Sequence, residues 1–402
     1  MQWMRRTASR REREKGAVAS IAAILVSSGV VMGMLALTVD VGNIMAERRQ
    51  LQNGADAATL ALARGCSKVP IAASCSTAAQ ASSALESLAG ANSVDGLQSL
   101  PVTDASSQPL ICGRNVPTLP TCTVAASAAD LAACLPLPTT LDAAAPYVET
   151  RTTTKTAGSE PNALTSFFAK AAVPGYTDKQ YTACSRAAWG PPSGTGATLP
   201  LTIGNCEWVK MTAGGTKYAP SPPYSPAPGS ATTSLPSNVS AGGYVVGIQS
   251  HADSNNVDPS CRKANGEYYP GGFGWLSETD CVTTINADAT VVGETGAAVP
   301  NGCKTAVNLN QYLGKEVFVP ISVTATGTGT SATYTMDGVA SFFMAGYSSL
   351  PSGGTSAVYK DELNVCANKC IWGWFTSGLM PVSTSIGPPN SGKGAVNIVP
   401  LG

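Results

Sequence analysis

The sequence has a single histidine, His251, and only 12% of its residues are Asp, Glu, Lys or Arg. With one histidine, a Ser–His–Asp or Cys–His site has only one possible base, and no G-x-S-x-G motif is present. The formal net charge is zero and no basic run follows the N-terminal region, which argues against a nucleic-acid partner. These features predict a protein that is not an enzyme and needs no cofactor or metal.

Two short segments resemble ligand-binding loops but lack the residues that define them. Gly387–Lys393 reads GPPNSGK and matches G-x-x-x-x-G-K, but Gly394 stands where Ser or Thr is needed and two prolines occupy the loop. The segment HADSNNVD, which begins at His251, lacks the ligand spacing and the closing Glu of a calcium loop. We therefore predict no catalytic, cofactor-binding or metal residues.

Long apolar runs are scarce, and one stands out: residues 17–39 contain no charge, Pro, Asn or Gln. As a helix this run is about 34 Å long, enough to cross a hydrocarbon core of about 30 Å. Residues 1–15 carry six basic and two acidic residues, or +4, which favours an N-terminus inside the cell. We expect a basic cytoplasmic tail (1–15) and a transmembrane helix (16–39). A cleaved secretory signal fits less well, because this apolar run is too long.

The helical pattern continues beyond the apolar run but turns polar, which predicts an amphipathic helix over residues 40–64. Apolar residues recur there at a/d spacing, with Arg48 at one of these positions. This stripe can pack on the protein's own globular domain or on helices of a homo- or hetero-oligomer. Arg48 favours packing on the protein's own globular domain, because a lone charge buried between helices costs stability. The predicted helix-packing interface consists of Val41, Ile44, Leu51, Ala55, Ala58 and Leu62.

All 12 cysteines follow the apolar run. An even number confined to the exported part predicts disulfides formed in an oxidising compartment. Zinc is disfavoured, because Cys366-x-x-x-Cys370 has no second close pair to accompany it and there is only one histidine. The sequence leaves the pairing open. The disulfide candidates are Cys66, Cys75, Cys112, Cys122, Cys134, Cys184, Cys206, Cys261, Cys281, Cys303, Cys366 and Cys370.

The low charge of the chain and its 41 Gly and 28 Pro predict short strands joined by many turns downstream of the helix. Residues 213–243 are rich in Pro, Gly, Ser and Thr and predict a linker or exposed loop. It separates a first α+β part (65–212) from a second, β-rich, cysteine-containing part (244–402). The predicted fold class is α+β: a long N-terminal helix, transmembrane then amphipathic, followed by a disulfide-stabilised, mainly β extracytoplasmic region.

The segment GAVASIAAIL…LTVDVGNIMAERRQLQNGADAATLALA resembles the N-terminal segment of the Tad (TadE/TadG-like) family of Flp pilus assembly proteins. The elements V-D-V-G, R-R-Q-L-Q-N and A-D-A-A carry this resemblance over about residues 15–64. With GGFGWL and CIWGWFTSGL, the chain looks like the cysteine-containing type of Gram-positive actinobacteria. The resemblance implies a structural component of a Tad/Flp-type pilus assembly or secretion apparatus. It would be anchored in the bacterial cytoplasmic membrane as a single-pass protein, with the lipid bilayer and other Tad proteins as partners.

Two other functions stay open at this point. Type IV prepilins are cut after a Gly and usually carry a Glu five residues later. If Gly16 were the cut site, that residue would be Ile21, and no acidic residue occurs before Asp40. This favours an assembly factor over a minor pilin-like subunit of the filament. The other alternative is a cell-surface binding or adhesion module that uses a Tad-type anchor.

Overall fold

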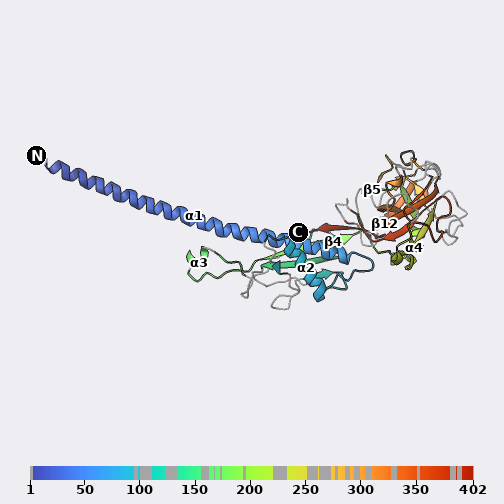
Figure 1. Ribbon diagram of the computed structural model, residues 1–402, viewed down its shortest axis with the longest axis horizontal. Helices are drawn as coiled ribbons and strands as arrows, with labels where there is room; N and C mark the ends of the chain where they lie inside the picture. The colour runs from blue at the N-terminus through green and yellow to red at the C-terminus, as the bar shows by residue number, and fades with distance from the viewer. Residues whose placement is uncertain are drawn as a thin grey trace.

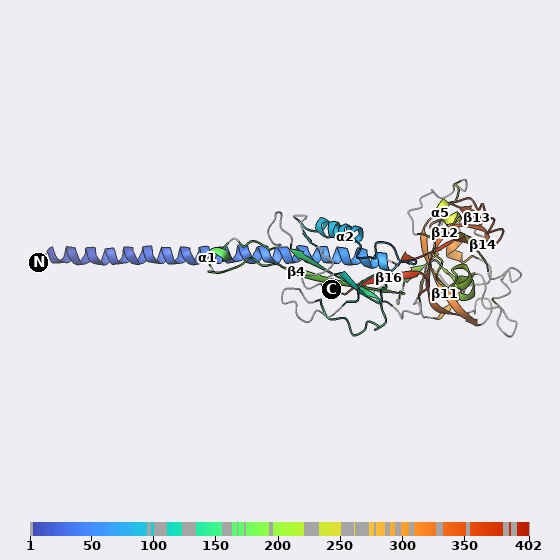
Figure 2. The same cartoon turned by 90° about the horizontal axis from the view of Figure 1, so that it is seen from below.

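The computed structural model of the protein describes residues 3–94, 98–99, 111–122, 134–154, 163–166, 168–172, 174–192, 196–220, 233–250, 261, 273–276, 279–285, 290–293, 299–304, 309–326, 333–350, 354–380, 386 and 392–401. The molecule is elongated: a long helix leads into a first sheet, and a second sheet lies at the far end (Figures 1 and 2).

Helix α1 (Trp3–Cys66) is continuous over 64 residues. No proline occurs before Pro70, and the helix is rich in alanine, the residue with the highest helix propensity. Its N-terminal half extends alone, away from the rest of the protein, whereas its C-terminal half lies on the first sheet (Figures 1 and 2).

Within the part of the chain that the structure describes, no helix is both long enough and apolar enough to cross a membrane. The predicted transmembrane helix over residues 16–39 is therefore wrong, and so is the predicted fold class that was built on it. Helix α1 has the length for a crossing, but among its described residues no stretch of that length is apolar enough. The single-pass topology and the lipid bilayer as a partner depended on this helix and are not supported.

The first sheet has the strand order β1-β3-β4-β16-β15, with β2 paired to β3. Its strands are β1 (Gln98–Ser99), β2 (Ile111–Arg114), β3 (Tyr147–Thr154), β4 (Thr182–Gly190), β15 (Gly378–Leu379) and β16 (Ala395–Pro400). β3 and β4 are antiparallel, and β16 pairs antiparallel with β4 through Ile398 opposite Trp189. Helix α2 (Ala79–Ala91) packs beside α1, and the short helix α3 (Ala169–Ala172) lies in an arm near α1 (Figure 1).

The second sheet has the order β7-β14-β12-β11-β6-β8, with β10 and β13 paired to β12. The strands are β6 (Leu201–Gly204), β7 (Val246–Gln249), β8 (Phe273–Trp275), β10 (Thr290–Val292), β11 (Glu316–Thr326), β12 (Thr333–Leu350), β13 (Gly354–Ala357) and β14 (Cys370–Thr376). A separate pair joins β5 (Gly196–Thr198) to β9 (Thr283–Ile285). Three short helices accompany this part: α4 (Asn205–Met211), α5 (Ser237–Ser240) and the 3-10 helix η3 (Asn301–Cys303).

Aromatic side chains fill the core of the second sheet. Phe343 and Trp374 face each other across β12 and β14 and stack with ring centroids 4.5 Å apart. Phe342 and Phe375, one position along, meet edge to face at 5.1 Å. Both geometries are the arrangements that aromatic rings prefer, and they fix the register of two long central strands.

The two sheets are not built from two consecutive stretches of chain. β6 and α4 precede residue 213 yet belong to the second sheet, while β15 and β16 follow β14 and return to the first. The chain therefore passes between the sheets twice, which ties them together. The predicted domain boundaries stay a prediction, and residues 221–232 of the predicted linker lie outside the described residues.

Candidate functional site

The C-terminal half of α1 is docked on one face of the first sheet. Of the predicted packing residues, four are completely buried there: Leu51, Ala55, Ala58 and Leu62. Val41 is 39% exposed and Ile44 is half-buried. The structure thus brings together the second part of the predicted stripe, against the protein's own sheet, and leaves its first part near the surface.

Polar side chains complete this docking. The Thr152 hydroxyl donates a hydrogen bond to the backbone carbonyl of Leu51 (2.8 Å). The Thr150 hydroxyl donates one to the backbone carbonyl of Ala55 (3.2 Å). Thr59 on α1 pairs with the Thr150 hydroxyl (2.5 Å). These hydroxyls are buried, and each hydrogen bond removes the cost of an unsatisfied polar atom. The helix therefore has one specific position on the sheet.

Arg48 occupies a stripe position that the sequence placed in the packing interface, but its side chain is exposed. Its guanidinium carbon lies 5.2 Å from the centre of the Tyr181 ring, a cation–π distance. Burial raises the pKa of the Tyr181 phenol, the nearby Tyr176 raises it further, and Arg48 acts in the opposite direction. The helix thus keeps this charge at the surface, where water still solvates it.

Asp40 holds the arm that contains α3. Its carboxylate accepts hydrogen bonds from the Ser166 hydroxyl (2.8 Å) and from the backbone N–H groups of Phe168 (3.0 Å) and Ala169 (2.6 Å). The side chain is only 7% exposed, so these donors replace the water that a carboxylate requires. Asp40 belongs to the V-D-V-G element, and it links α1 to a segment more than a hundred residues away.

Sequence reasoning missed three polar residues of this interface: Asp40, Glu47 and Thr59, all buried. The spacing of the buried acidic residues along the sequence could have revealed them. Asp40 and Glu47 are seven residues apart and Glu47 and Leu51 are four apart, so all three share one helix face. Apart from Arg48, the stripe was defined by its hydrophobic residues, so its buried polar members were not predicted.

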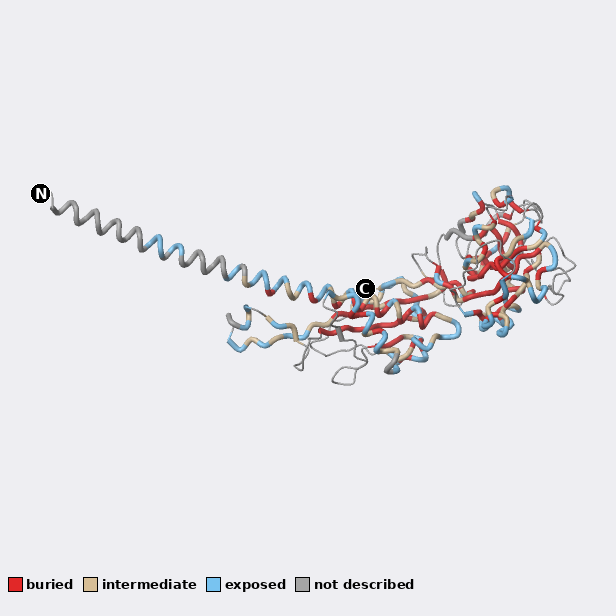
Figure 3. The backbone as a smooth tube through the Cα atoms, in the orientation of Figure 1, coloured by how far each residue is buried: buried red, intermediate tan, exposed pale blue. Residues whose placement is uncertain are grey.

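The N-terminal half of α1 has large apolar side chains that are open to solvent. Among the described residues, Ile21, Ile24, Met34 and Leu37 are 59%, 64%, 64% and 66% exposed, respectively. Among the residues of α1 that Figure 3 colours by burial, buried positions begin where the helix reaches the sheet. Helices with apolar residues in water usually bury them against a partner.

The 12 cysteines form six disulfides, which confirms the disulfide prediction. The pairs are Cys66–Cys75, Cys112–Cys122, Cys134–Cys184, Cys206–Cys261, Cys281–Cys303 and Cys366–Cys370. The first of them closes the loop that follows α1. The largest sequence separation within a pair is 55 residues, so each disulfide joins segments of the same region rather than the two ends of the chain.

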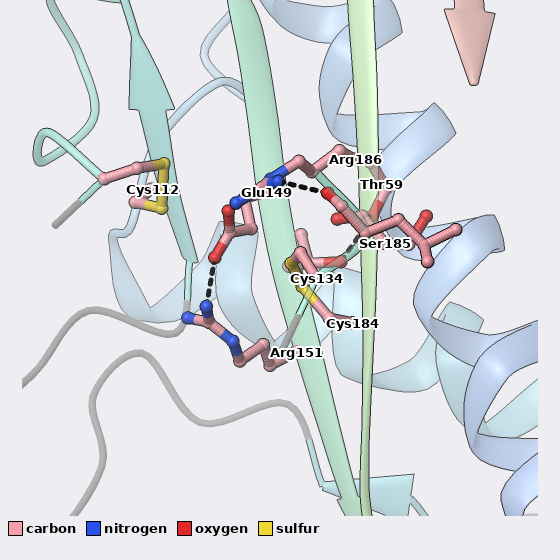
Figure 4. A network of polar contacts seen from close by, with 11 residues as sticks. Thr59, Cys112, Cys134, Glu149, Arg151, Cys184, Ser185 and Arg186 are labelled. Carbon is pink, nitrogen blue, oxygen red and sulfur yellow. Dashed lines mark hydrogen bonds and ion pairs between the residues drawn. A yellow bond between two sulfur atoms is a disulfide. The ribbon is translucent and has the colours of Figure 1, made fainter. Parts of the chain in front are cut away.

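The face of the first sheet that is turned away from α1 has a buried ion cluster (Figure 4). Glu149 on β3 pairs with Arg151 (2.5 Å) and with Arg186 of β4 (2.6 Å). Arg186 also donates to the carbonyl of Leu135 (2.6 Å). Opposite faces follow from strand alternation: Thr150 and Thr152 point to α1, while Glu149 and Arg151 point away from it.

The segments weighed for catalysis lie largely outside the described residues: His251 and its loop, and residues 387–391 of the G-x-x-x-x-G-K segment. Lys393, the last residue of that segment, is described and is buried. Its ammonium pairs with Asp337 (3.0 Å) and lies 4.6 Å from the centre of the Trp208 ring. This lysine is engaged in packing between β12 and α4.

Residues 16–64 match the Flp pilus-assembly TadE/G-like family model, named Tad. The matched segment is the helix α1 from Gly16 to Arg64, including Asp40 and the docked face. No curated protein and no solved structure matches the chain. The match supports a role related to pilus assembly in the cell envelope, and the resemblance to the actinobacterial type stays a prediction.

Proposed function

We propose that the chain is a structural, non-enzymatic component of an Flp-type pilus assembly apparatus that uses the N-terminal half of α1, which projects beyond the first sheet, to bind other subunits. The docked half fixes the helix to the first sheet through Asp40 and the Leu51–Leu62 face. The N-terminal half then projects beyond this docked part (Figures 1 and 2). The observation that carries the proposal is the contrast, within the matched segment, between buried residues such as Leu51 and Leu62 and exposed apolar residues such as Met34 and Leu37.

The exposure of large apolar side chains on the N-terminal half of α1 favours burial of these side chains against a partner subunit. Ile21, Ile24, Met34 and Leu37 each leave more than half of their surface exposed. Burying such side chains contributes about 25 cal/mol per Å² of apolar area, so an amphipathic or apolar helix of another subunit is a suitable partner. Rigid docking lowers the entropic cost of binding, because the helix is already formed.

The test is site-specific photo-crosslinking in cells that make the pilus. A photoreactive amino acid replaces Leu37, which is 66% exposed, and in a matched control it replaces Leu363, which is 52% exposed on the second sheet's side of the protein. We expect crosslinks to another pilus-assembly subunit from position 37 and none from position 363. Crosslinks from position 363 alone, or from neither position, would contradict the proposal.

Charged replacements sharpen this test. Leu51 and Ala55, which the hydrophobic pattern singles out, are buried against the protein's own sheet, so changing them damages the fold. Met34→Glu and Leu37→Glu change only exposed positions and should abolish copurification of the complex while leaving the disulfides and the far-ultraviolet circular dichroism unchanged. A complex that survives both changes would argue that the N-terminal half of α1 does not bind another subunit.

The choice between an assembly factor and a minor filament subunit is tested by intact mass. We propose the assembly factor, because no acidic residue occurs between Gly16 and Asp40. Full-length chain recovered only from the cell envelope agrees with this role. A chain beginning near Ala17 and recovered from sheared filaments would instead identify a minor pilin-like subunit.

A further inference from the structure

Helix α1 carries an exposed apolar stripe on a face other than the one that packs on the first sheet. Its members recur at spacings of three and four positions: Met34 (64% exposed), Leu37 (66%), Val41 (39%) and Met45 (58%). Residues at these spacings share one side of a helix. The stripe therefore begins on the N-terminal half of α1 and continues past Asp40 into the part that is docked.

The arm that contains α3 adds an aromatic side chain beside this stripe. The arm runs back along α1, and its tip is fixed where Asp40 accepts the backbone N–H of Phe168 (Figures 1 and 2). Leu37 precedes Asp40 by about one turn of the helix, and Val41 follows it directly. Phe168, which is 44% exposed, is thus held at the level of these two residues and widens the apolar surface.

Positive charge borders this apolar surface on the side of the first sheet. Arg48 continues the stripe three positions after its last apolar member, Lys179 lies on the arm, and both are exposed. Lys170 and Asp178 form an ion pair at the arm, which carries no net charge. The acidic residues of this stretch of α1 are buried, namely Asp40 and Glu47. The charge presented to a partner here is therefore positive.

We propose that this composite surface, made of the stripe from Met34 to Met45 together with Phe168, binds a helix of a different subunit whose own apolar stripe ends in acidic residues. Helix α1 rises about 16 Å from Met34 to Met45, so about three turns of a partner helix cover the stripe. Acidic side chains beyond those turns would reach Arg48 and Lys179. The inference rests on the proposed function and adds the binding face, the part played by the arm and the charge of the partner.

A second copy of this chain fits the composite surface poorly. Parallel packing in register would place Arg48 of one copy against Arg48 of the other. Antiparallel packing of the same stripe would centre on about residue 40 of each copy, by the 1.5 Å rise of the helix. It would lay residues 1–15, with their formal charge of +4, near the end of α1 in the other copy, which carries Arg64 and precedes Lys68. Like charges brought together are destabilising, so the charge pattern favours a different subunit.

The experiment is photo-crosslinking of the full chain in cells that make the pilus. A photoreactive amino acid replaces Phe168 in one variant and Leu37 in another, and a matched control carries it in place of Val94, which is 91% exposed after the end of α2. Mass spectrometry identifies the crosslinked peptides. We expect positions 37 and 168 to crosslink to the same helix of the same partner subunit, with acidic residues within about two turns of the crosslinked site, and position 94 to give no crosslink to it.

The outcomes separate this inference from the proposed function. Crosslinks from position 37 without any from position 168 would overturn the inference and leave the proposed use of α1 intact. Crosslinks from position 168 to a second copy of this chain, or to a partner helix without acidic residues, would also overturn it. Crosslinks from neither position would contradict both the inference and the proposed function.

Charge reversal tests the acidic partner directly. Arg48→Glu should lower the yield of the crosslink from position 168 at least about fivefold, because it places a negative charge against acidic side chains. Arg64→Glu makes the same change at an exposed position of α1 beyond the stripe and should leave the yield unchanged. Far-ultraviolet circular dichroism checks that both variants fold like the wild type. Equal yields from the two variants would overturn the assignment of an acidic partner.

Discussion

Asp40 on α1 accepts the backbone N–H of Ala169 at 2.6 Å, although 129 positions separate the two residues in the chain. The same carboxylate also accepts the Ser166 hydroxyl and the Phe168 N–H. One acidic residue of the family segment thus determines where the α3 arm lies relative to the helix.

Asp40→Asn should loosen this arm. The amide keeps one acceptor oxygen but loses the charge that strengthens three hydrogen bonds, each worth about 1.5–3 kcal/mol when one partner is charged. We expect faster hydrogen exchange at residues 164–180 by about tenfold or more, with little change in β11 and β12. The control is Asp56→Asn on the same helix, which removes the charge of a carboxylate that accepts a hydrogen bond from the Gln52 side chain. This change should leave the arm unchanged.

Leu51→Ala should destabilise the docking of α1. Leu51 is completely buried against the first sheet, and such a truncation costs about 2–5 kcal/mol through lost burial and the cavity it leaves. Met45→Ala, at a side chain 58% exposed, should change stability by less than about 0.5 kcal/mol. Hydrogen exchange of the β3 and β4 amides measures the effect of each substitution on the docking. Similar exchange in the two variants would contradict the docking.

Glu149→Gln in the oxidised protein should be among the most destabilising single changes in the first sheet. It leaves Arg151 and Arg186 largely buried without a counter-charge, and breaking a buried pair in this way costs about 3–5 kcal/mol. Lys170→Met, which breaks the pair with Asp178 at a lysine side chain that is 60% exposed, should cost less than about 1 kcal/mol. Denaturant unfolding with the disulfides intact compares the two variants, and equal costs would count against the burial argument.

Acid should loosen the end of the arm through Asp178. The Ser166 backbone N–H and the Lys170 ammonium both favour the charged form, so the pKa of this carboxyl lies below the ordinary value for an aspartate. A lowered folded pKa means that the stabilisation is complete above the unfolded value and is lost as the pH falls through the folded one. Amide exchange at Ser166, corrected for its intrinsic pH dependence, should rise over that range. Asp178→Asn should remove this rise, and its persistence in that variant would assign it to another group.

Raising the pH into the alkaline range should destabilise the second sheet, whereas the effect on the arm appears as the pH falls. Burial raises the pKa values of the Tyr218, Tyr334 and Tyr347 phenols, because it disfavours the phenolate. A raised folded pKa means that these groups stabilise the fold below their unfolded value, about 10, and that this contribution is lost as the pH rises through the folded values. Ultraviolet titration should show these phenols ionising later than in the unfolded chain. A titration that coincides with the unfolded one would contradict their burial.

The local pattern of the sequence determined several features. The continuous helix follows from alanine-rich sequence without proline up to Pro70, and the even number of cysteines after the apolar run predicted the disulfides. The match to the family model lies in that same helix. These features depend on neighbouring residues or on composition, which a single sequence displays directly.

Tertiary structure alone decided the rest. The burial of Asp40 and Glu47 on the docked face, the pairing of Cys134 with Cys184, and the return of β16 to β4 all join residues that are distant in the chain or polar where an apolar residue was expected. The membrane-crossing prediction was wrong for a related reason, because it took a run of apolar residues in the sequence as sufficient evidence of a transmembrane helix. No described helix combines the length and the apolarity that a membrane crossing requires. Strand register and helix docking are set by the sum of many weak non-local contacts, and the identity of any one residue carries little of that information.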